Sequence, residues 1–141
     1  MSGAEPRPAT ALVVGTDDWA IEQLIAKLVA SRHDTLRCHE PGEPAFPCNA
    51  FIEGRRCPLD VGFDVVVTVR ARPLQDPAPA ETGVTCALRA GIPVVVAGMI
   101  AGNPFRDVAA GVVSQSGDVS AACDAAAVRA QVVDLRQVRT P

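Results

Sequence analysis

The sequence has few aromatic residues and no long hydrophobic run. Phe, Trp and Tyr make up 4% of the 141 residues, although hydrophobic residues as a whole make up 48%. A buried core must therefore be built from aliphatic side chains. No apolar run approaches the roughly 20 residues that cross a bilayer, and the first ten residues lack the charged-then-apolar order of a secretory signal. We therefore expect a cytoplasmic protein with no membrane segment.

Positive charge and enzyme motifs are also scarce. Thirteen Lys and Arg against sixteen Asp and Glu give a net charge of -3, which is too little positive field to hold a nucleic acid backbone directly. The chain has only two histidines, and it contains no phosphate-binding loop, dinucleotide fingerprint, nucleophile elbow or H-E-x-x-H pattern. These absences favour a non-enzymatic role.

The pattern of apolar residues predicts alternating strands and helices. Residues 11–15 are a continuous apolar run, and 63–69 and 92–98 are rich in β-branched residues; all three are typical of strands buried in a parallel sheet. Residues 34–39 and 111–113 are weaker strands. Helical spacing of apolar residues follows the first run and recurs at 81–90 and after Asp118. We therefore predict an α/β fold, a three-layer αβα sandwich with a mostly parallel, five-stranded sheet. A single domain is expected over 11–135, with a disordered tail at 1–10 and a tail at 136–141.

A loop rich in cysteine and proline, residues 38–60, interrupts this alternation. Its proline content is too high for regular structure, and loops of this length are usually functional or disordered. Cys38, His39, Cys48 and Cys57 lie in it, and thiolates with an imidazole are ligands for zinc or an iron–sulfur cluster. The dipeptide at 57–58, Cys-Pro, also occurs in ferredoxin cluster motifs and at haem-responsive sites. The loop is therefore predicted to bind a metal, a cluster or haem.

The cysteine spacing, nine residues and then eight, matches no standard zinc finger, so two other interpretations stay open. The thiols could form reversible disulfides, or they could be ordinary buried thiols. Arg55 and Arg56 would lower the pKa of the Cys57 thiol, which favours ligation and redox chemistry alike. Cys86 and Cys123 fall in predicted helices among apolar residues, and we assign both to the core.

Asp17 and Asp18 follow the first predicted strand. Parallel sheets bind ligands at this end of their strands, and the two carboxylates could bind Mg²⁺ as part of a cofactor site. Asp is also a preferred helix cap, which would explain at least one of the two residues without a ligand.

The order of elements, the pair Asp17-Asp18 and the segment 64–73 (DVVVTVRARP) together resemble a response-regulator receiver domain over about residues 11–130. The resemblance implies a flavodoxin-like scaffold and a signalling role with protein partners. Receivers carry a phosphate-accepting Asp where this chain has Val69, and a Lys near the last strand, whereas the single Lys here is Lys27 in the first helix. The resemblance thus implies a degenerate receiver that lacks phosphorylation.

Residues 13–18 (VVGTDD) are also similar to the opening of universal stress proteins. That resemblance implies a nucleotide-binding stress-type domain in which Asp17 helps to hold an adenine nucleotide. Gly98, Gly102 and Gly111 do not have the spacing of that family's phosphate loop.

Taken together, these patterns predict a non-enzymatic regulatory or sensor domain. Cys38, Cys48 and Cys57, with His39, would hold a zinc ion or an iron–sulfur cluster, and a partner protein, which could be a second copy of the chain, would respond to the state of the loop. The alternatives are a thiol–disulfide redox protein that uses the same cysteines and a nucleotide-binding domain that uses the Asp17 turn.

Overall fold

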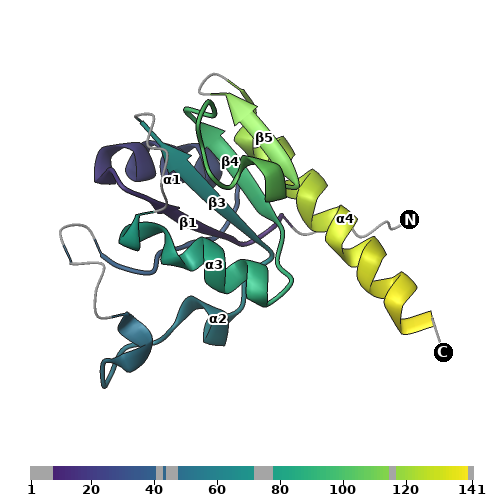
Figure 1. Cartoon of the computed structure of the whole chain (residues 1–141), viewed down its shortest axis with the longest axis horizontal. Coiled ribbons are helices and arrows are strands. Elements are labelled where there is room, and N and C mark those ends of the chain that lie inside the picture. The colour runs from purple at the N-terminus through teal and green to yellow at the C-terminus, as the bar shows by residue number, and fades with distance from the viewer. Residues whose placement is uncertain (1–7, 41–42, 44–47, 72–77, 115–116, 140–141) are drawn as a thin grey trace.

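The structure is a computed structural model that describes residues 8–40, 43, 48–71, 78–114 and 117–139, without the side chains of Asn49 and residues 131–139. Five parallel strands form one sheet in the order β2-β1-β3-β4-β5 (Figure 1). This strand order is that of the flavodoxin-like α/β fold, so the predicted fold class is confirmed. The strands are β1 (Ala11–Gly15), β2 (Thr35–Leu36), β3 (Val65–Arg70), β4 (Val94–Gly98) and β5 (Gly111–Ser114).

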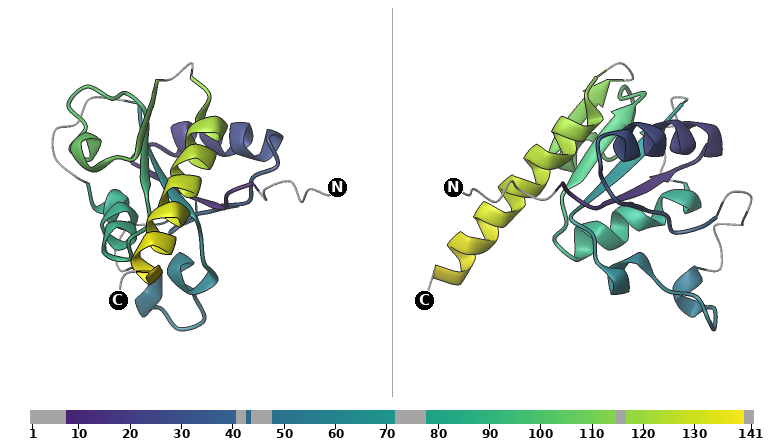
Figure 2. Two further views of the ribbon diagram at one scale, coloured as in Figure 1. Left: turned by 90° about the vertical axis from the view of Figure 1, so that its right-hand side faces the viewer. Right: turned by 180° about the vertical axis from the view of Figure 1, so that it is seen from behind.

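The central strands are buried because helices cover both faces of the sheet. Every residue of β1 and β3 is buried, which explains their continuous apolar sequences. One face carries α1 (Asp18–Ala30) and α4 (Val119–Arg139), and the other carries α3 (Thr82–Arg89) (Figure 2). The remaining elements are the short helix α2 (Pro58–Val61) and the 3₁₀ turns η1 (Asn49–Phe51), η2 (Pro79–Glu81) and η3 (Arg106–Val108).

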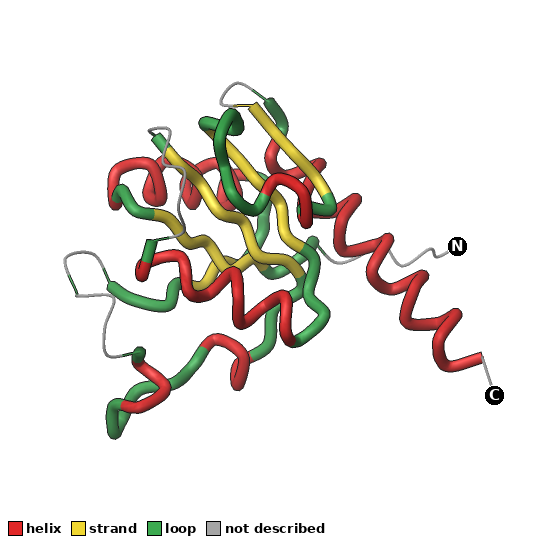
Figure 3. The backbone as a smooth tube through the Cα atoms, viewed as in Figure 1, coloured by secondary structure: helices red, strands yellow, loops and turns green. Residues whose placement is uncertain are grey.

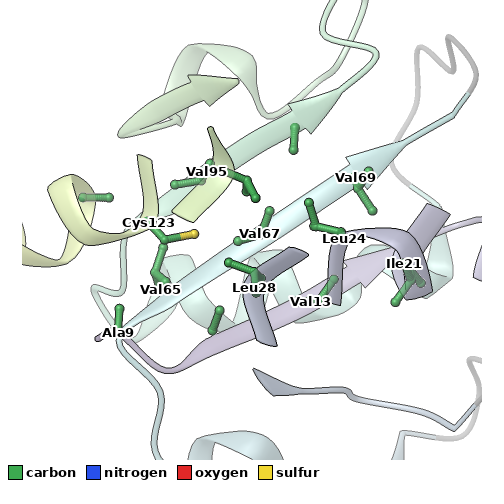
Figure 4. Close-up of a cluster of buried hydrophobic side chains, with 14 of the residues drawn as sticks. Ala9, Val13, Ile21, Leu24, Leu28, Val65, Val67, Val69, Val95 and Cys123 are labelled. Atoms are coloured by element: carbon green, nitrogen blue, oxygen red, sulfur yellow. The ribbon is translucent and has the colours of Figure 1, made fainter. Parts of the chain in front are cut away.

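Each face of the sheet has its own aliphatic core. The core beneath α1 and α4 includes Leu28, Val65 and Cys123 (Figure 4). The core beneath α3 includes Leu12, Val84 and larger side chains such as Phe63 and Phe105. Assignment of Cys123 to the core is confirmed, since this residue is fully buried.

The ends of the ordered chain differ from those predicted. Ala9 is buried, its N–H donates to Asp124 Oδ1 at 3.3 Å, and the N–H of Thr10 donates to Asp64 Oδ2 at 2.8 Å. These bonds hold residues 9 and 10 beside the sheet, so they are not part of a disordered tail. Helix α4 continues to Arg139, past the boundary expected at 135. Residues 1–7 and 140–141 lie outside the described part of the chain.

The connection from β2 to β3 is the irregular part of the α3 face. Strand β2 has only two residues, whereas we expected it to reach residue 39. The described part of the connection contains only η1 and α2, and it lies beside α3 (Figure 3). We refer to residues 37–64 as the β2–β3 crossover. It contains the cysteine- and proline-rich loop.

Candidate functional site

A cavity of about 350 Å³ lies between the β2–β3 crossover and α3. Four cysteines line it: Cys38 just after β2, Cys48 before η1, Cys57 before α2, and Cys86 within α3. The first three belong to the set of metal ligands predicted from the sequence. The other lining residues are Leu12, His39, Ala50, Phe51, Pro58, Leu59, Phe63, Thr82 and Gly83.

The hollow follows from the local sequence of the crossover. Parallel strands must be joined by a crossover, and in α/β sheets this is usually a helix whose apolar stripe packs on the sheet. In the described part of this crossover the chain forms only the short elements η1 and α2, and Pro58 stands at the start of α2, where no helix continues into it. Short turns therefore cover this part of the sheet, and the space that a helix would fill remains as a cavity lined by thiols and apolar side chains.

Helix α3 presents a face of small residues to the cavity. Thr82, Gly83 and Cys86 all line it, in agreement with the i, i+3 and i+4 spacing that places residues on one helix face. Gly83 is required by the close packing, because a Cβ atom at this position would lie 2.9 Å from Cys38 Sγ and 3.0 Å from Val14 Cγ1. The absence of a side chain at Gly83 thus lets Cys38 approach α3.

The assignment of Cys86 to the core was therefore incomplete. The residue is half-buried and lines the cavity, while Val84 and Ala87 of the same helix are fully buried in the core. The sequence contains a pattern that could have distinguished Cys86 from the core residues of the same helix. Cys86 lies one helical turn after the polar Thr82, which is exposed, whereas Val84 and Ala87 share another face of the helix.

Cys57 and Pro58 begin helix α2. Cys57 is the N-cap residue with extended backbone angles, and the buried Pro58 occupies the first helical position, where its missing N–H costs nothing. The two residues therefore fix both the direction of the chain and the place of the Cys57 thiol at the cavity wall.

His39 also lines the cavity, and its Nε2 atom is buried with no hydrogen-bond partner. A buried polar atom without a partner is rare and needs an explanation. The backbone of His39 is held in place, since its carbonyl oxygen accepts a hydrogen bond from Arg37 Nε at 3.1 Å.

Another, more polar hollow of about 160 Å³ lies beside the thiol-lined cavity. The two hollows share Cys38 and His39, and Asp18, Arg37 and Glu43 also line the polar one.

Burial, with smaller contributions from the charges of Cys48, Cys57 and Cys86, raises the pKa of the Cys38 thiol to about 12. The Cys38 thiol therefore keeps its proton at neutral pH unless a cation is added.

The sulfur atoms do not converge on one point. All five cysteines lie outside disulfides. Among the residues that the structure describes, no three His, Cys, Asp or Glu side chains are arranged to hold a single metal ion. The predicted metal ligands Cys38, His39, Cys48 and Cys57 thus share one cavity, but they surround it rather than meet at its centre.

Arg55 is an exposed residue that pairs with Glu43 at 2.9 Å across the crossover. The N–H of Glu40 and the Arg55 guanidinium lower the pKa of the Glu43 carboxyl. The charge of Arg55 is therefore compensated by a carboxylate, which weakens the predicted effect of this residue on the neighbouring thiol.

Asp17 and Asp18 are both engaged within the protein. Asp17 caps α1, where its Oδ1 accepts hydrogen bonds from the N–H groups of Trp19 at 2.9 Å and Ala20 at 3.3 Å. Asp18 forms an ion pair with Arg37 at 2.9 Å. Helix capping and this ion pair account for the two carboxylates without a Mg²⁺ ion or nucleotide, although Asp18 does border the polar hollow.

The end of β3 lacks the residue that a receiver would phosphorylate. The strand contains no Asp, and Val69 is buried against the core beneath α1 and α4. The next residue, Arg70, is also buried and pairs with Glu81 of η2. An internal ion pair thus occupies this corner of the sheet.

No protein-family model matches the chain, and no curated protein matches it. Among solved structures, the chain is similar to the solution structure of a response regulator protein from Burkholderia multivorans, with 16% identity and a TM-score of 0.45 over 86% of this chain and 94% of that one. The strand order and the parallel pairing define a flavodoxin-like α/β domain.

Proposed function

We propose that this chain is a non-enzymatic regulatory or sensor domain that binds a metal or iron–sulfur cofactor through Cys38, Cys48 and Cys57. The observation that carries the proposal is that these three cysteines, from separate turns of the β2–β3 crossover, line one cavity. A thiol that serves only as a small apolar side chain packs in a core, as Cys123 does. Cys38 also packs against the core beneath α3, but Cys48 and Cys57 are members of neither core.

The chemistry of the cavity suits a cofactor with thiolate ligands. Zinc and iron–sulfur clusters are held mainly by cysteine sulfur. The walls around the thiols include the buried side chains of Leu12 and Phe63, which make this side of the cavity apolar. His39 brings a buried nitrogen atom without a partner to the same space, either as a ligand or as a hydrogen-bond donor to one.

Cofactor binding would connect the crossover to the rest of the domain. The Arg55–Glu43 pair joins two places in the described part of this segment, and ligation by three cysteines would fix three of its turns at once. Phe51, Leu59 and Val61 are exposed on its surface, and their positions would change with the state of the cofactor. We infer that a partner protein responds to that change. This mode of signalling needs no phosphate-accepting Asp.

None of the described helices has the length and apolar character needed to cross a membrane.

Metal analysis and an absorption spectrum of anaerobically purified protein test the proposal. We expect stoichiometric iron or zinc in the unaltered chain and its loss in Cys48→Ala, with the sheet still folded by circular dichroism. Cys123→Ala is the matched control, because Cys123 is a thiol buried in the opposite core.

Two results would overturn the proposal. One is equal metal content in the Cys48→Ala and Cys123→Ala proteins. The other is a metal-free chain that loses two thiols on mild oxidation, which would instead establish a redox protein using the same cysteines.

A further inference from the structure

The fourth cysteine of the cavity deepens the proposed function and rests on it. Cys86 is carried by α3, an element packed on the sheet, whereas the other three thiols lie on the crossover. We propose that Cys86 is the fourth thiolate ligand and that the cofactor is a four-iron iron–sulfur cluster rather than a single zinc ion.

The arrangement of the sulfur atoms argues against a single ion. Tetrahedral zinc with Zn–S bonds of about 2.3 Å draws its four sulfur atoms to roughly 3.8 Å from one another. Such a site leaves no space between its ligands. In this structure the four cysteines border a cavity of about 350 Å³, and no three of the described ligand-type side chains could hold one ion.

A four-iron cluster fits the same arrangement. The cluster is itself a body of iron and sulfide that occupies space, and it takes four cysteine thiolates. Its irons lie at the corners of a cube and point in four directions. The cysteines come from four separate places in the fold and include no C-x-x-C pair. On binding, each thiol gives its proton to solvent and forms one Fe–S bond, and the oxidation state of the cluster does not change.

Two local features agree with this assignment. Gly83 allows Cys38 Sγ to lie against α3, one helical turn from Cys86, so the first and fourth ligands face the cavity from neighbouring positions. Cys57 is followed by Pro58, as is the last cysteine of bacterial ferredoxin cluster motifs. Pro58 is buried at the cavity wall.

The experiment measures iron, acid-labile sulfide and zinc in the full chain after anaerobic treatment with ferric iron, sulfide and a thiol that reduces part of the iron to the ferrous state. We expect about four irons and four sulfides per chain, with a broad charge-transfer absorption from the mixed-valence cluster. Cys86→Ala should lose at least three quarters of the bound iron, and Thr85→Ser, an exposed neighbour on the same helix, should keep all of it. Circular dichroism establishes that each variant is folded.

The outcomes separate this inference from the proposed function. One zinc per chain in place of iron, two irons per chain, or unchanged iron in a folded Cys86→Ala protein would overturn the inference and leave a cofactor site at the other three cysteines. A chain that binds neither metal would overturn both. If Cys86→Ala did not fold, the same comparison with Cys86→Ser would decide the question.

Discussion

The side chains of Arg70 and Glu81 form a doubly hydrogen-bonded ion pair in which both groups are almost completely buried. Arg70 Nε lies 2.9 Å from Glu81 Oε2, and Arg70 Nη2 lies 2.7 Å from Glu81 Oε1. The carboxylate also accepts hydrogen bonds from the N–H of Ala78 and the hydroxyl of Thr68. The pair therefore joins the end of β3 to the turn that begins α3.

Removing the charge of Glu81 should strongly destabilise the domain. Glu81→Gln keeps the shape of the side chain but leaves the Arg70 guanidinium buried without its counter-charge. Breaking a buried pair in this way costs about 3–5 kcal/mol. Urea denaturation of the variant and the unaltered chain measures the difference in the free energy of unfolding.

The double variant Arg70→Met, Glu81→Leu is the control for this prediction. It removes both charges, so it should recover most of the lost stability. A Glu81→Gln protein as stable as the unaltered chain would show that the pair is not buried as described.

Gly83→Ala should be unfavourable even though Ala is the better helix former by about 1 kcal/mol. The added Cβ would lie 2.9 Å from Cys38 Sγ, so that sulfur atom must move. We expect a net loss of about 1 kcal/mol in the free energy of unfolding, since overpacking typically costs about 1–3 kcal/mol. Thermal and urea unfolding of the cofactor-free chain measure it.

Gly111→Ala is the matched comparison. Its Cβ would make an ordinary contact of 3.6 Å with Val95, and its backbone needs no left-handed conformation. We therefore expect no loss of stability in this variant. Equal effects of the two substitutions would contradict the tight packing between Gly83 and Cys38.

The cofactor-free protein should lose stability in alkaline solution because of its buried thiols. Burial, and to a lesser extent Asp124, raise the pKa of Cys123 from 9.0 to about 12. The unfolded chain then loses this proton before the folded chain does. The stabilisation is complete below pH 9 and falls as the pH rises from 9 to 12, by about 1.4 kcal/mol per pH unit for one such thiol.

Apart from the cysteines, few side chains titrate in that window, because the chain has no Tyr and only one Lys. Cys38, whose pKa is also raised to about 12, adds a slope of its own in both proteins. Urea denaturation from pH 8 to 11 should therefore show a smaller slope in Cys123→Ala than in the unaltered chain. A slope that does not change in this variant would mean that Cys123 is not the buried, protonated thiol described.

Asp17 and Asp18 should respond differently to substitution. Asp17→Ala removes the cap of α1 and should cost about 0.5–2 kcal/mol. Asp18→Asn removes a largely exposed ion pair with Arg37 and should change stability by less than about 1 kcal/mol. If Asp17→Ala left stability unchanged but abolished nucleotide binding, the nucleotide-binding alternative would replace our proposal.

The sheet could be predicted from the sequence because its signals are local. Runs such as 11–15 and 65–67 are apolar throughout, and at such short length this pattern is typical of strands buried on both faces. The short length of β2 and the order of residues 9 and 10 could not be predicted. The order of residues 9 and 10 depends on bonds to Asp124 and Asp64, which are distant in the sequence.

The candidate site was predicted only in part. Three of its cysteines lie within 20 residues of one another, so their grouping needed no knowledge of the fold. Cys86 lies 29 positions after Cys57, and it joins them only because α3 packs beside the crossover. The Arg70–Glu81 pair was likewise missed, since two charges 11 residues apart give no sign that both will be buried.

The irregular crossover bears on whether the domain folds before or after a cofactor binds. Sheet pairing, the core beneath α1 and α4 and the Arg70–Glu81 pair involve no cysteine of the cavity, and Cys38 alone of the four packs against the core beneath α3. If the chain binds a cofactor as we propose, the sheet can fold before the cofactor binds, unlike zinc fingers, which are unfolded without their ion. Cofactor binding would then be a late and reversible step on a domain that is already folded.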